Sequence, residues 1–277
     1  MYESYYRLRE KPFSILPDPD LIYWGPSHRL AFAMLEFGVL NNAGFTVITG
    51  EIGSGKTTLV RHLLRKIDPA TISVGLISNT PQKRKELLQW ILMSLDQPFE
   101  GSSPSLLKQF HRFIEAQTAN GKRTILIVDE AQNLGSETLE ALRMLSNVNV
   151  DKRQALQLIL IGQPQLRDLL SGPELLQFAQ RVASDFHLKA LPLQEVEKYI
   201  DFRLRAVGSQ DPLFSVDATD MIGKASGGIP RLINILCDTA MVYGFAIGAE
   251  RINADIVNTV IQDKRHFGIF PNMINAV

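Results

Sequence analysis

The sequence is 277 residues long, which is enough for one large domain or for a medium-sized domain with a smaller partner. Hydrophobic residues make up 45% and charged residues 21%, as in ordinary soluble globular proteins, and the 29 basic residues balance the 29 acidic ones, so no overall charge attracts nucleic acid or anionic lipid. The single cysteine, Cys237, excludes an internal disulfide, and neither a secretory signal nor a membrane-spanning apolar run is present, so we expect a cytoplasmic protein.

The first 26 residues are rich in aromatic residues and prolines and predict an irregular arm. A helix capped by Ser27 should follow, as far as about Leu40. The β-branched run GFTVIT, 44–49, predicts a strand, and the apolar spacing after Lys56 predicts a helix that ends before Pro69.

Strands and helices continue to alternate as far as residue 191. The remaining predicted strands are 71–78, 123–128, 155–162 and, with a weaker signal, 185–188. The helices between them are expected to begin at Thr80-Pro81, Ser103-Pro104 and Ser136, because proline suits the first helical turn and serine suits a helix cap. This alternation, with apolar strands such as ILIV and LILI, predicts an α/β core built on a five-stranded parallel sheet with helices on both faces.

After Leu191 the strand signals stop, and only helices are expected. They cover 193–207, 217–225, 229–246 and 253–265. We therefore predict four regions: an arm (1–26), an α/β nucleotide-binding core (27–191), a small all-α lid (192–265) and a C-terminal tail (266–277), which is either a docking segment or a disordered end.

Residues 50–57 read GEIGSGKT and fit the phosphate-loop pattern G-x-x-x-x-G-K-[ST]. Glycines let backbone N–H groups face phosphate oxygens, and a helix beginning at Lys56 points the positive end of its dipole at them. Lys56 can reach the β- and γ-phosphates, and the Thr57 hydroxyl can coordinate Mg²⁺. The alternative is a glycine-rich turn beside a surface lysine, which the flanking strand and helix disfavour. The residues predicted to bind ATP here are Gly50, Glu51, Ile52, Gly53, Ser54, Gly55, Lys56, Thr57 and Thr58.

The run ILIVDE, 125–130, predicts a strand that delivers Asp129 to the carboxyl edge of the sheet, where it would hold Mg²⁺. Glu130 would deprotonate the attacking water. Gln163, at the end of LILIGQ, would lie between the γ-phosphate and Glu130 and position that water. The alternative for 125–130 is a strand that ends in solvated acids, and the alternative for Gln163 is a plain strand-to-turn junction. The nearby phosphate loop disfavours both. The Asp-Glu pair and the extra strand before it favour an ATP-hydrolysing protein over a small kinase.

Two arginines are candidates for stabilising charge on the transferred phosphoryl group. Arg181 follows a helical stretch, and Arg231 begins a helix of the second region. An ATPase whose site lies at a subunit boundary needs a cation from its neighbour and benefits from one on its own lid. Arg167, Arg203 and Arg205 compete for these roles.

The segments GEIGSGKTT, ILIVDEAQNL, LILIGQPQLRDLL, QRV and SGGIPRLINILCDTA resemble the AAA+ ATPases of the general secretion pathway protein A (ExeA) type. So does the N-terminal YYRLREKPFSILPDPDLIYWGPSHRLAFAMLEFGV. The segments MYESYYRLREKPFS, ELLQFAQRV and CDTAMVYGFA are similar to the secretion ATPase of exosortase/PEP-CTERM exopolysaccharide loci. The resemblance covers about residues 1–265.

The resemblance implies a AAA+ core with a helical lid, Mg²⁺-dependent ATP hydrolysis, and a ring or partial ring of identical subunits such as a hexamer. It assigns Arg181 as a finger acting in trans, Arg231 as a lid sensor, and Tyr23 with the Gly25-Pro26 turn as neighbours of the adenine. It names envelope secretion or polysaccharide-export proteins as partners. ExeA itself continues into a transmembrane helix and a peptidoglycan-binding region that these residues do not include, so we expect any location at the inner membrane to come through partners, unless the sequence is a truncated piece.

The leading hypothesis is an ATPase that drives an envelope secretion or exopolysaccharide-export system. The alternative is a DNA-associated ATPase resembling transposition helper proteins, for which QKRKE, 82–86, is the compact basic candidate, although such a run is more typical of a solvated helix start. A degenerate nucleotide-binding scaffold is disfavoured because Lys56, Asp129 and Glu130 are all present. DEAQ, 129–132, does not indicate a helicase, because no second recombinase-like domain follows.

Overall fold

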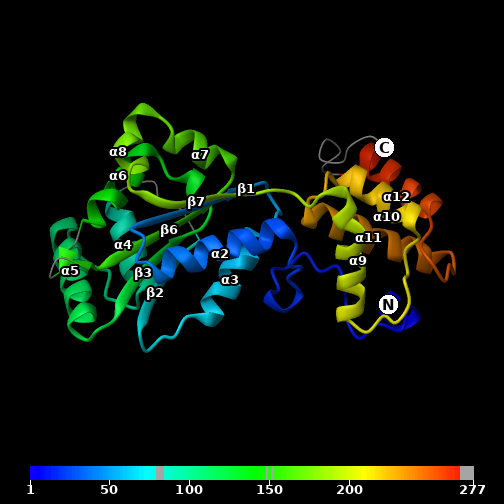
Figure 1. Ribbon diagram of the computed structural model, residues 1–277, viewed down its shortest axis with the longest axis horizontal. Helices are drawn as coiled ribbons and strands as arrows, with labels where there is room; N and C mark the ends of the chain where they lie inside the picture. Colours follow the sequence, from blue (N-terminus) through cyan, green and yellow to red (C-terminus); the bar gives the residue numbers. More distant parts are fainter. Residues whose placement is uncertain (79–83, 148, 151–152, 269–277) are drawn as a thin grey trace. The chain divides into compact units, whose positions relative to one another are not determined.

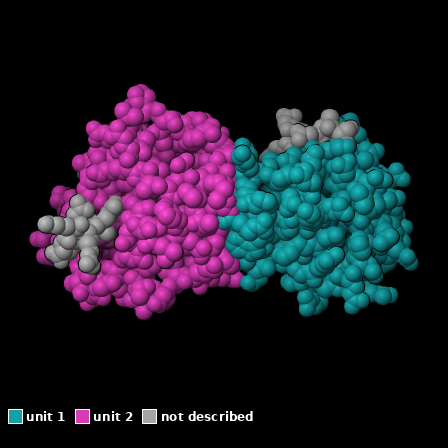
Figure 2. Space-filling view, in the orientation of Figure 1, with its two compact units in different colours: residues 1–29, 51–61, 189–277 teal, residues 30–50, 62–188 magenta. Residues whose placement is uncertain are grey.

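The computed structural model describes residues 1–78, 84–147, 149–150 and 153–268 (Figure 1). The chain divides into two compact units, which Figure 2 colours separately. Unit 1 comprises Met1–Arg29, Glu51–Arg61 and Lys189–Val277, and unit 2 comprises Leu30–Gly50 and His62–Leu188. The arm, core, lid and tail boundaries drawn from the sequence stay a prediction.

Unit 2 contains the predicted five-stranded parallel sheet, which is thereby confirmed. Its strands are β1 (Phe45–Gly50), β2 (Ile72–Ile77), β3 (Arg123–Val128), β6 (Leu156–Gly162) and β7 (Val182–Leu188), in the spatial order β2-β3-β6-β1-β7. Thr49 pairs with Gly162 and Val128 pairs with Leu160, so β1, β3 and β6 end at the same edge of the sheet. A short antiparallel pair, β4 (Asn149–Val150) and β5 (Arg153–Gln154), was not predicted, because two residues are too few to show an alternating pattern.

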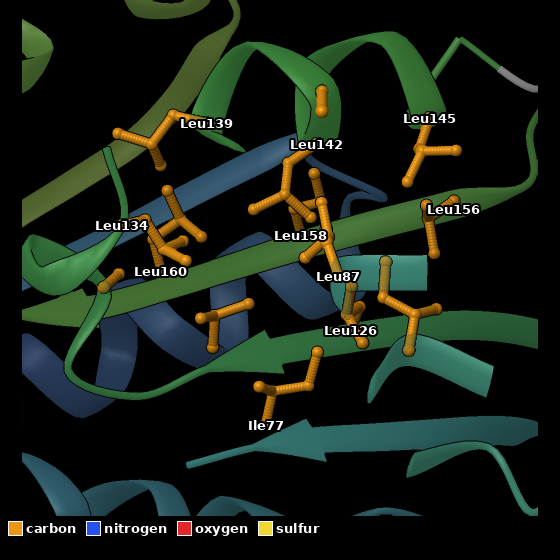
Figure 3. Packing of buried hydrophobic residues seen from close by; sticks show 14 of the residues in the cluster. Ile77, Leu87, Leu126, Leu134, Leu139, Leu142, Leu145, Leu156, Leu158 and Leu160 are labelled. Carbon is orange, nitrogen blue, oxygen red and sulfur yellow. The ribbon is translucent and has the colours of Figure 1, made fainter. Parts of the chain in front are cut away.

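One face of this sheet carries the larger apolar core. The helices that contribute to it are α4 (Arg84–Ser94), α5 (Ser103–Ala119), α6 (Ser136–Leu145), α7 (Pro164–Leu170) and α8 (Leu176–Ala179). Figure 3 shows leucines of α6, among them Leu142, pointing toward Leu158 of β6. Burying such side chains stabilises the fold by about 25 cal/mol for each Å² of apolar surface removed from water. The predicted helix start at Thr80-Pro81 lies outside the described residues.

Helix α2 (Pro26–Leu40) supplies contacts to β7, where the Ser184 hydroxyl donates to the Met34 carbonyl at 3.2 Å. The predicted cap at Ser27 is wrong, since the helix already includes Pro26. Proline fits the first helical position because it has no N–H to satisfy there. The Ser27 hydroxyl instead accepts a hydrogen bond from the backbone N–H of Lys189 at 3.2 Å.

Unit 1 contains the predicted helices of the C-terminal region. They are α9 (Leu193–Ala206), α10 (Val216–Ser226), α11 (Pro230–Ala246) and α12 (Ala254–Phe267), and the segment 1–26 adds α1 (Tyr2–Tyr5) and a single 3-10 turn, η1 (Pro19–Leu21). Aromatic and apolar residues of the N-terminal segment, Tyr2, Tyr6, Leu8 and Phe13, are buried in the apolar core of these helices. Among the described residues, no helix is both long and apolar enough to span a bilayer.

Candidate functional site

The phosphate loop has the backbone that its sequence predicts. Strand β1 ends at Gly50, and α3 (Lys56–Lys66) begins five residues after Glu51. Gly53 and Gly55 both have positive φ, +80° and +102°, a region that side chains other than glycine rarely adopt. The loop therefore turns sharply and leads directly into a helix N-terminus, which is the arrangement that binds phosphate through backbone N–H groups.

Two side chains of the loop, those of Lys56 and Ser54, are buried. Lys56 is only 6% exposed, and its Nζ donates to the Glu51 carbonyl at 2.9 Å, across the loop. Ser54 is fully buried, and its hydroxyl has no hydrogen-bond partner among the described residues. A buried orphan hydroxyl beside two left-handed glycines is a polar cradle that suits a phosphate. Of the other predicted loop residues, Gly50 is buried, Glu51 and Ile52 are exposed, and the rest are half-buried: Gly53, Gly55, Thr57 and Thr58.

The first turn of α11 packs directly on this loop, within unit 1. The backbone N–H of Arg231 donates to the Gly53 carbonyl at 3.2 Å. A Cβ placed on Gly53 would lie 2.3 Å from the Arg231 Cβ, so only glycine fits. The structure thus packs the backbone of Arg231 against the loop and leaves the residue exposed, and its role toward phosphate stays a prediction.

His28, which sequence reasoning did not single out, also supports the loop. Its Nε2 lies 2.9 Å from the Ser54 carbonyl, and its Nδ1 is buried without a partner among the described residues. Burial lowers the pKa of the His28 imidazole below its ordinary value of 6.5. A neutral ring that donates from Nε2 fits these contacts. An isolated histidine in a helix has no pattern that would have predicted them.

The acid pair lies in unit 2, at the end of β3. Asp129 is buried at 9% exposure, and its backbone N–H donates to the Ile77 carbonyl at 2.8 Å. Its Oδ1 accepts from the Glu130 backbone N–H at 2.9 Å. Glu130 has φ +53° and ψ +37°, a left-handed conformation that is uncommon for a residue other than glycine. Such backbone strain persists only where surrounding contacts hold it, and it is concentrated at functional sites.

Gln163 lies where the sequence predicts, beside Glu130. It follows β6, the neighbour of β3, and its Nε2 donates to Glu130 Oε2 at 3.1 Å. Gln132, which was not predicted, donates to the same oxygen at 2.5 Å. Its Oε1 also accepts from the Gln163 backbone N–H at 3.0 Å. Two amides and one carboxylate therefore form a closed network at this edge of the sheet.

Arg181 is exposed, between α8 and β7. Its guanidinium donates to the Asn147 side-chain oxygen and lies 3.5 Å from the Ser146 hydroxyl, just after α6. The Arg181 guanidinium therefore contacts the end of α6, and its role toward a neighbouring subunit stays a prediction. Of its competitors, Arg167 is exposed beside Asp168 at 3.5 Å.

Arg203, another candidate for the role of phosphate-binding arginine, is excluded from that role by its structural contacts. Only 6% of it is exposed, and its Nε donates to the Pro12 carbonyl at 2.6 Å, so it ties the N-terminal segment to α9. Tyr23, the predicted adenine neighbour, donates its hydroxyl to Glu195 at 2.6 Å and packs edge-on against Tyr199. Burial raises the pKa of Tyr23 to about 12. Its role toward adenine stays a prediction.

Comparison with known proteins matches one long segment of the chain to a known family. Residues 40–170 match the family described as AAA domain. The chain is 39% identical over 254 residues to general secretion pathway protein A of Aeromonas hydrophila, a match that covers 91% of this chain but only 46% of that protein. The chain is therefore similar to the AAA domain family over these residues and to that secretion protein, and it spans about half the length of this curated relative.

Solved structures share the fold at low identity. The Aeropyrum pernix ORC2 protein, in its ADPNP-ADP complexes, has a TM-score of 0.63 and 18% identity, covering 87% of this chain and 67% of that one. Cdc6p from Pyrobaculum aerophilum has a TM-score of 0.67 and 17% identity, covering 90% and 71%. A mutant of RuvB from Thermotoga maritima has a TM-score of 0.57 and 21% identity, covering 87% and 69%. These likenesses establish the P-loop NTPase fold and nothing about the substrate.

Proposed function

We propose that this chain is an AAA-type ATPase that couples the binding and hydrolysis of Mg²⁺-ATP to an envelope secretion or exopolysaccharide-export system. The observation that carries the ATPase part is the phosphate loop. Its two left-handed glycines, the buried Lys56 at a helix N-terminus and the orphan Ser54 hydroxyl form a cradle for a polyphosphate.

In this mechanism, loop N–H groups bind the phosphate oxygens, and Lys56 exchanges the Glu51 carbonyl for β- and γ-phosphate oxygens. Thr57 and Asp129 supply a hydroxyl and a carboxylate, which are oxygen ligands that fit Mg²⁺. When bound, that ion would neutralise charge on the phosphate oxygens.

Glu130 acts as the base in this proposal. It takes a proton from water, whose oxygen attacks the γ-phosphorus; the new O–P bond replaces the bond to ADP, which leaves with the electron pair. Gln163 orients the water beside it, supported by its 3.1 Å contact with the carboxylate. Arg231 would contact the phosphates from the same chain, and exposed Arg181 would serve the site of the next subunit in a ring or partial ring.

The process we propose is supported by one relative. General secretion pathway protein A of Aeromonas hydrophila is 39% identical, whereas the solved structures share 21% identity or less. We therefore prefer secretion over the DNA-associated alternative, with a location at the inner membrane through partner proteins. The exopolysaccharide assignment rests on the resemblance of the N-terminal and Cys237 segments. The basic run 82–86 was the candidate DNA contact of the alternative function, and its residues 82 and 83 lie outside the described residues.

Phosphate release from Mg²⁺-ATP tests the catalytic part. Glu130→Gln should keep its nucleotide affinity, and its turnover rate should fall by about 10²- to 10⁴-fold, because the variant lacks the base but retains the loop. Glu137→Gln, an exposed acid in the first turn of α6, is the matched control and should turn over normally. Equal rates for the two variants would contradict the assignment of Glu130.

A titration with duplex DNA at two salt concentrations tests the alternative. Binding through phosphates weakens steeply as salt rises. We expect no such salt-dependent binding. Tight, salt-sensitive binding would favour the DNA-associated function.

A further inference from the structure

Gln132 is the residue that joins the two strand ends of the acid-amide network. It sits in a 3-10 turn, η2 (Ala131–Asn133), directly after Glu130. Its Oε1 accepts from the Gln163 backbone N–H at 3.0 Å, and because that N–H can only donate, the amide orientation is settled. Its Nε2 must then face Glu130, where it donates to Oε2 at 2.5 Å.

The backbone around Gln132 is shaped for this contact. A Cβ on Gly162 would lie 2.7 Å from Gln132 Oε1, so the glycine at the end of β6 leaves the space that the amide fills. The turn itself is closed by hydrogen bonds from Asn133 N–H to the Glu130 carbonyl at 3.0 Å and from Leu134 N–H to the Ala131 carbonyl at 3.1 Å. Leu134 is buried, which anchors the turn in the core.

The backbone of Glu130 is left-handed, with φ +53°, which is uncommon for a residue other than glycine and is concentrated at functional sites. Both amides engage Oε2, and no hydrogen bond to Oε1 from the described residues accompanies them. This arrangement fixes the carboxylate through one oxygen and leaves the other for water.

We propose that Gln132 is a positioning residue: it fixes the Glu130 carboxylate relative to the Gln163 main chain, so that Oε1 of Glu130 faces the attacking water. The proposal rests on the ATPase function proposed above. The contact with the main chain of Gln163 also predicts a property that needs no nucleotide: the Gln163 N–H should be protected from hydrogen exchange by Gln132.

Two variants separate the two contacts of Gln132. Gln132→Ala removes both, so the Gln163 N–H should exchange about fivefold faster, as expected for a lost hydrogen bond. Gln132→Glu keeps an acceptor for that N–H but replaces the donor to Glu130 with a like charge, so protection should remain. Both should lose about 30-fold in kcat with KM within about threefold, because substrate binding does not use this network.

Gly162→Ala gives a test with Gln132 still present. The added methyl group would lie 2.7 Å from Gln132 Oε1 and 2.9 Å from Leu166 Cδ2, so the amide must move and this variant should lose kcat as Gln132→Ala does. The matched control is Gln165→Ala, an exposed glutamine two residues beyond Gln163, which should leave both rate and exchange unchanged.

The proposal is overturned if folded Gln132→Ala keeps wild-type kcat. It is also overturned if the Gln163 N–H exchanges at the wild-type rate in Gln132→Ala. If the wild type shows no ATP turnover but the Gln163 N–H still exchanges faster in Gln132→Ala, the proposed function is rejected, whereas the contact between Gln132 and the Gln163 main chain is supported.

Discussion

Gly53→Ala is the substitution for which the structure allows the effect to be worked out most fully. Gly53 has φ +80°, so any side chain is strained there by about 1 kcal/mol. The new Cβ would lie 2.3 Å from the Arg231 Cβ, whereas carbon atoms pack at about 3.5 Å or more. Since a Cβ cannot rotate away, the loop or the first turn of α11 must move by about 1 Å, which stretches the 3.2 Å bond from the Arg231 N–H to the Gly53 carbonyl.

The matched control is Gly248→Ala in the same unit. Its φ is +69°, and an added Cβ meets nothing within 4 Å, so it carries the strain without the clash. Gly248→Ala should lose about 1 kcal/mol of unfolding free energy and keep its affinity for ATP. Gly53→Ala should lose about 2 kcal/mol, the strain plus one weakened hydrogen bond, and bind ATP about tenfold more weakly.

Chemical denaturation and calorimetric titration with Mg²⁺-ATP measure these two quantities. If Gly53→Ala binds ATP as tightly as Gly248→Ala, the packing of α11 on the phosphate loop does not matter for nucleotide binding. The reasoning about Arg231 would then be refuted.

Two further predictions concern Arg181 and His28. Arg181→Ala should bind ATP yet hydrolyse it poorly, and mixing it with Glu130→Gln should restore part of the activity, because some mixed interfaces contain one intact site; a co-assembling mixture without rescue contradicts a role in trans. Burial lowers the pKa of His28, so near pH 6.5 the unfolded chain binds a proton that the folded chain does not bind. The neutral His28 therefore contributes folding stability above that pH, and this contribution is lost as the pH falls through the folded pKa. Denaturation between about pH 7.5 and 5.5 should therefore show a shallower loss for His28→Gln than for the wild type, and equal slopes would contradict the assignment.

The sheet and the loop were predictable because their signals are local. Buried parallel strands are continuous apolar runs, such as ILIV in β3 and LILI in β6, and the phosphate loop carries its glycines at fixed spacing. The approach of Gln163 to Glu130 followed as well, since parallel neighbours end at one edge. These inferences need only chain order and period.

Gln132, His28 and the Gly53–Arg231 contact were not predictable in the same way. Each depends on a single polar or small residue meeting another far along the chain, and one such residue has no period. The burial of Tyr2 and Phe13 was missed for a related reason: prolines break up the N-terminal segment, so its apolar residues show neither a helical nor a strand pattern.

Calorimetric titration of Mg²⁺-ATP into the wild type, Lys56→Ala and Lys108→Ala tests the central claim most directly. The wild type and Lys108→Ala, which changes an exposed lysine of α5, should bind one nucleotide per chain with equal affinity. Lys56→Ala should show no binding heat while remaining folded, because it removes the buried ammonium of the loop. A wild-type protein that binds no nucleotide, or a folded Lys56→Ala that binds as the wild type does, would contradict the account.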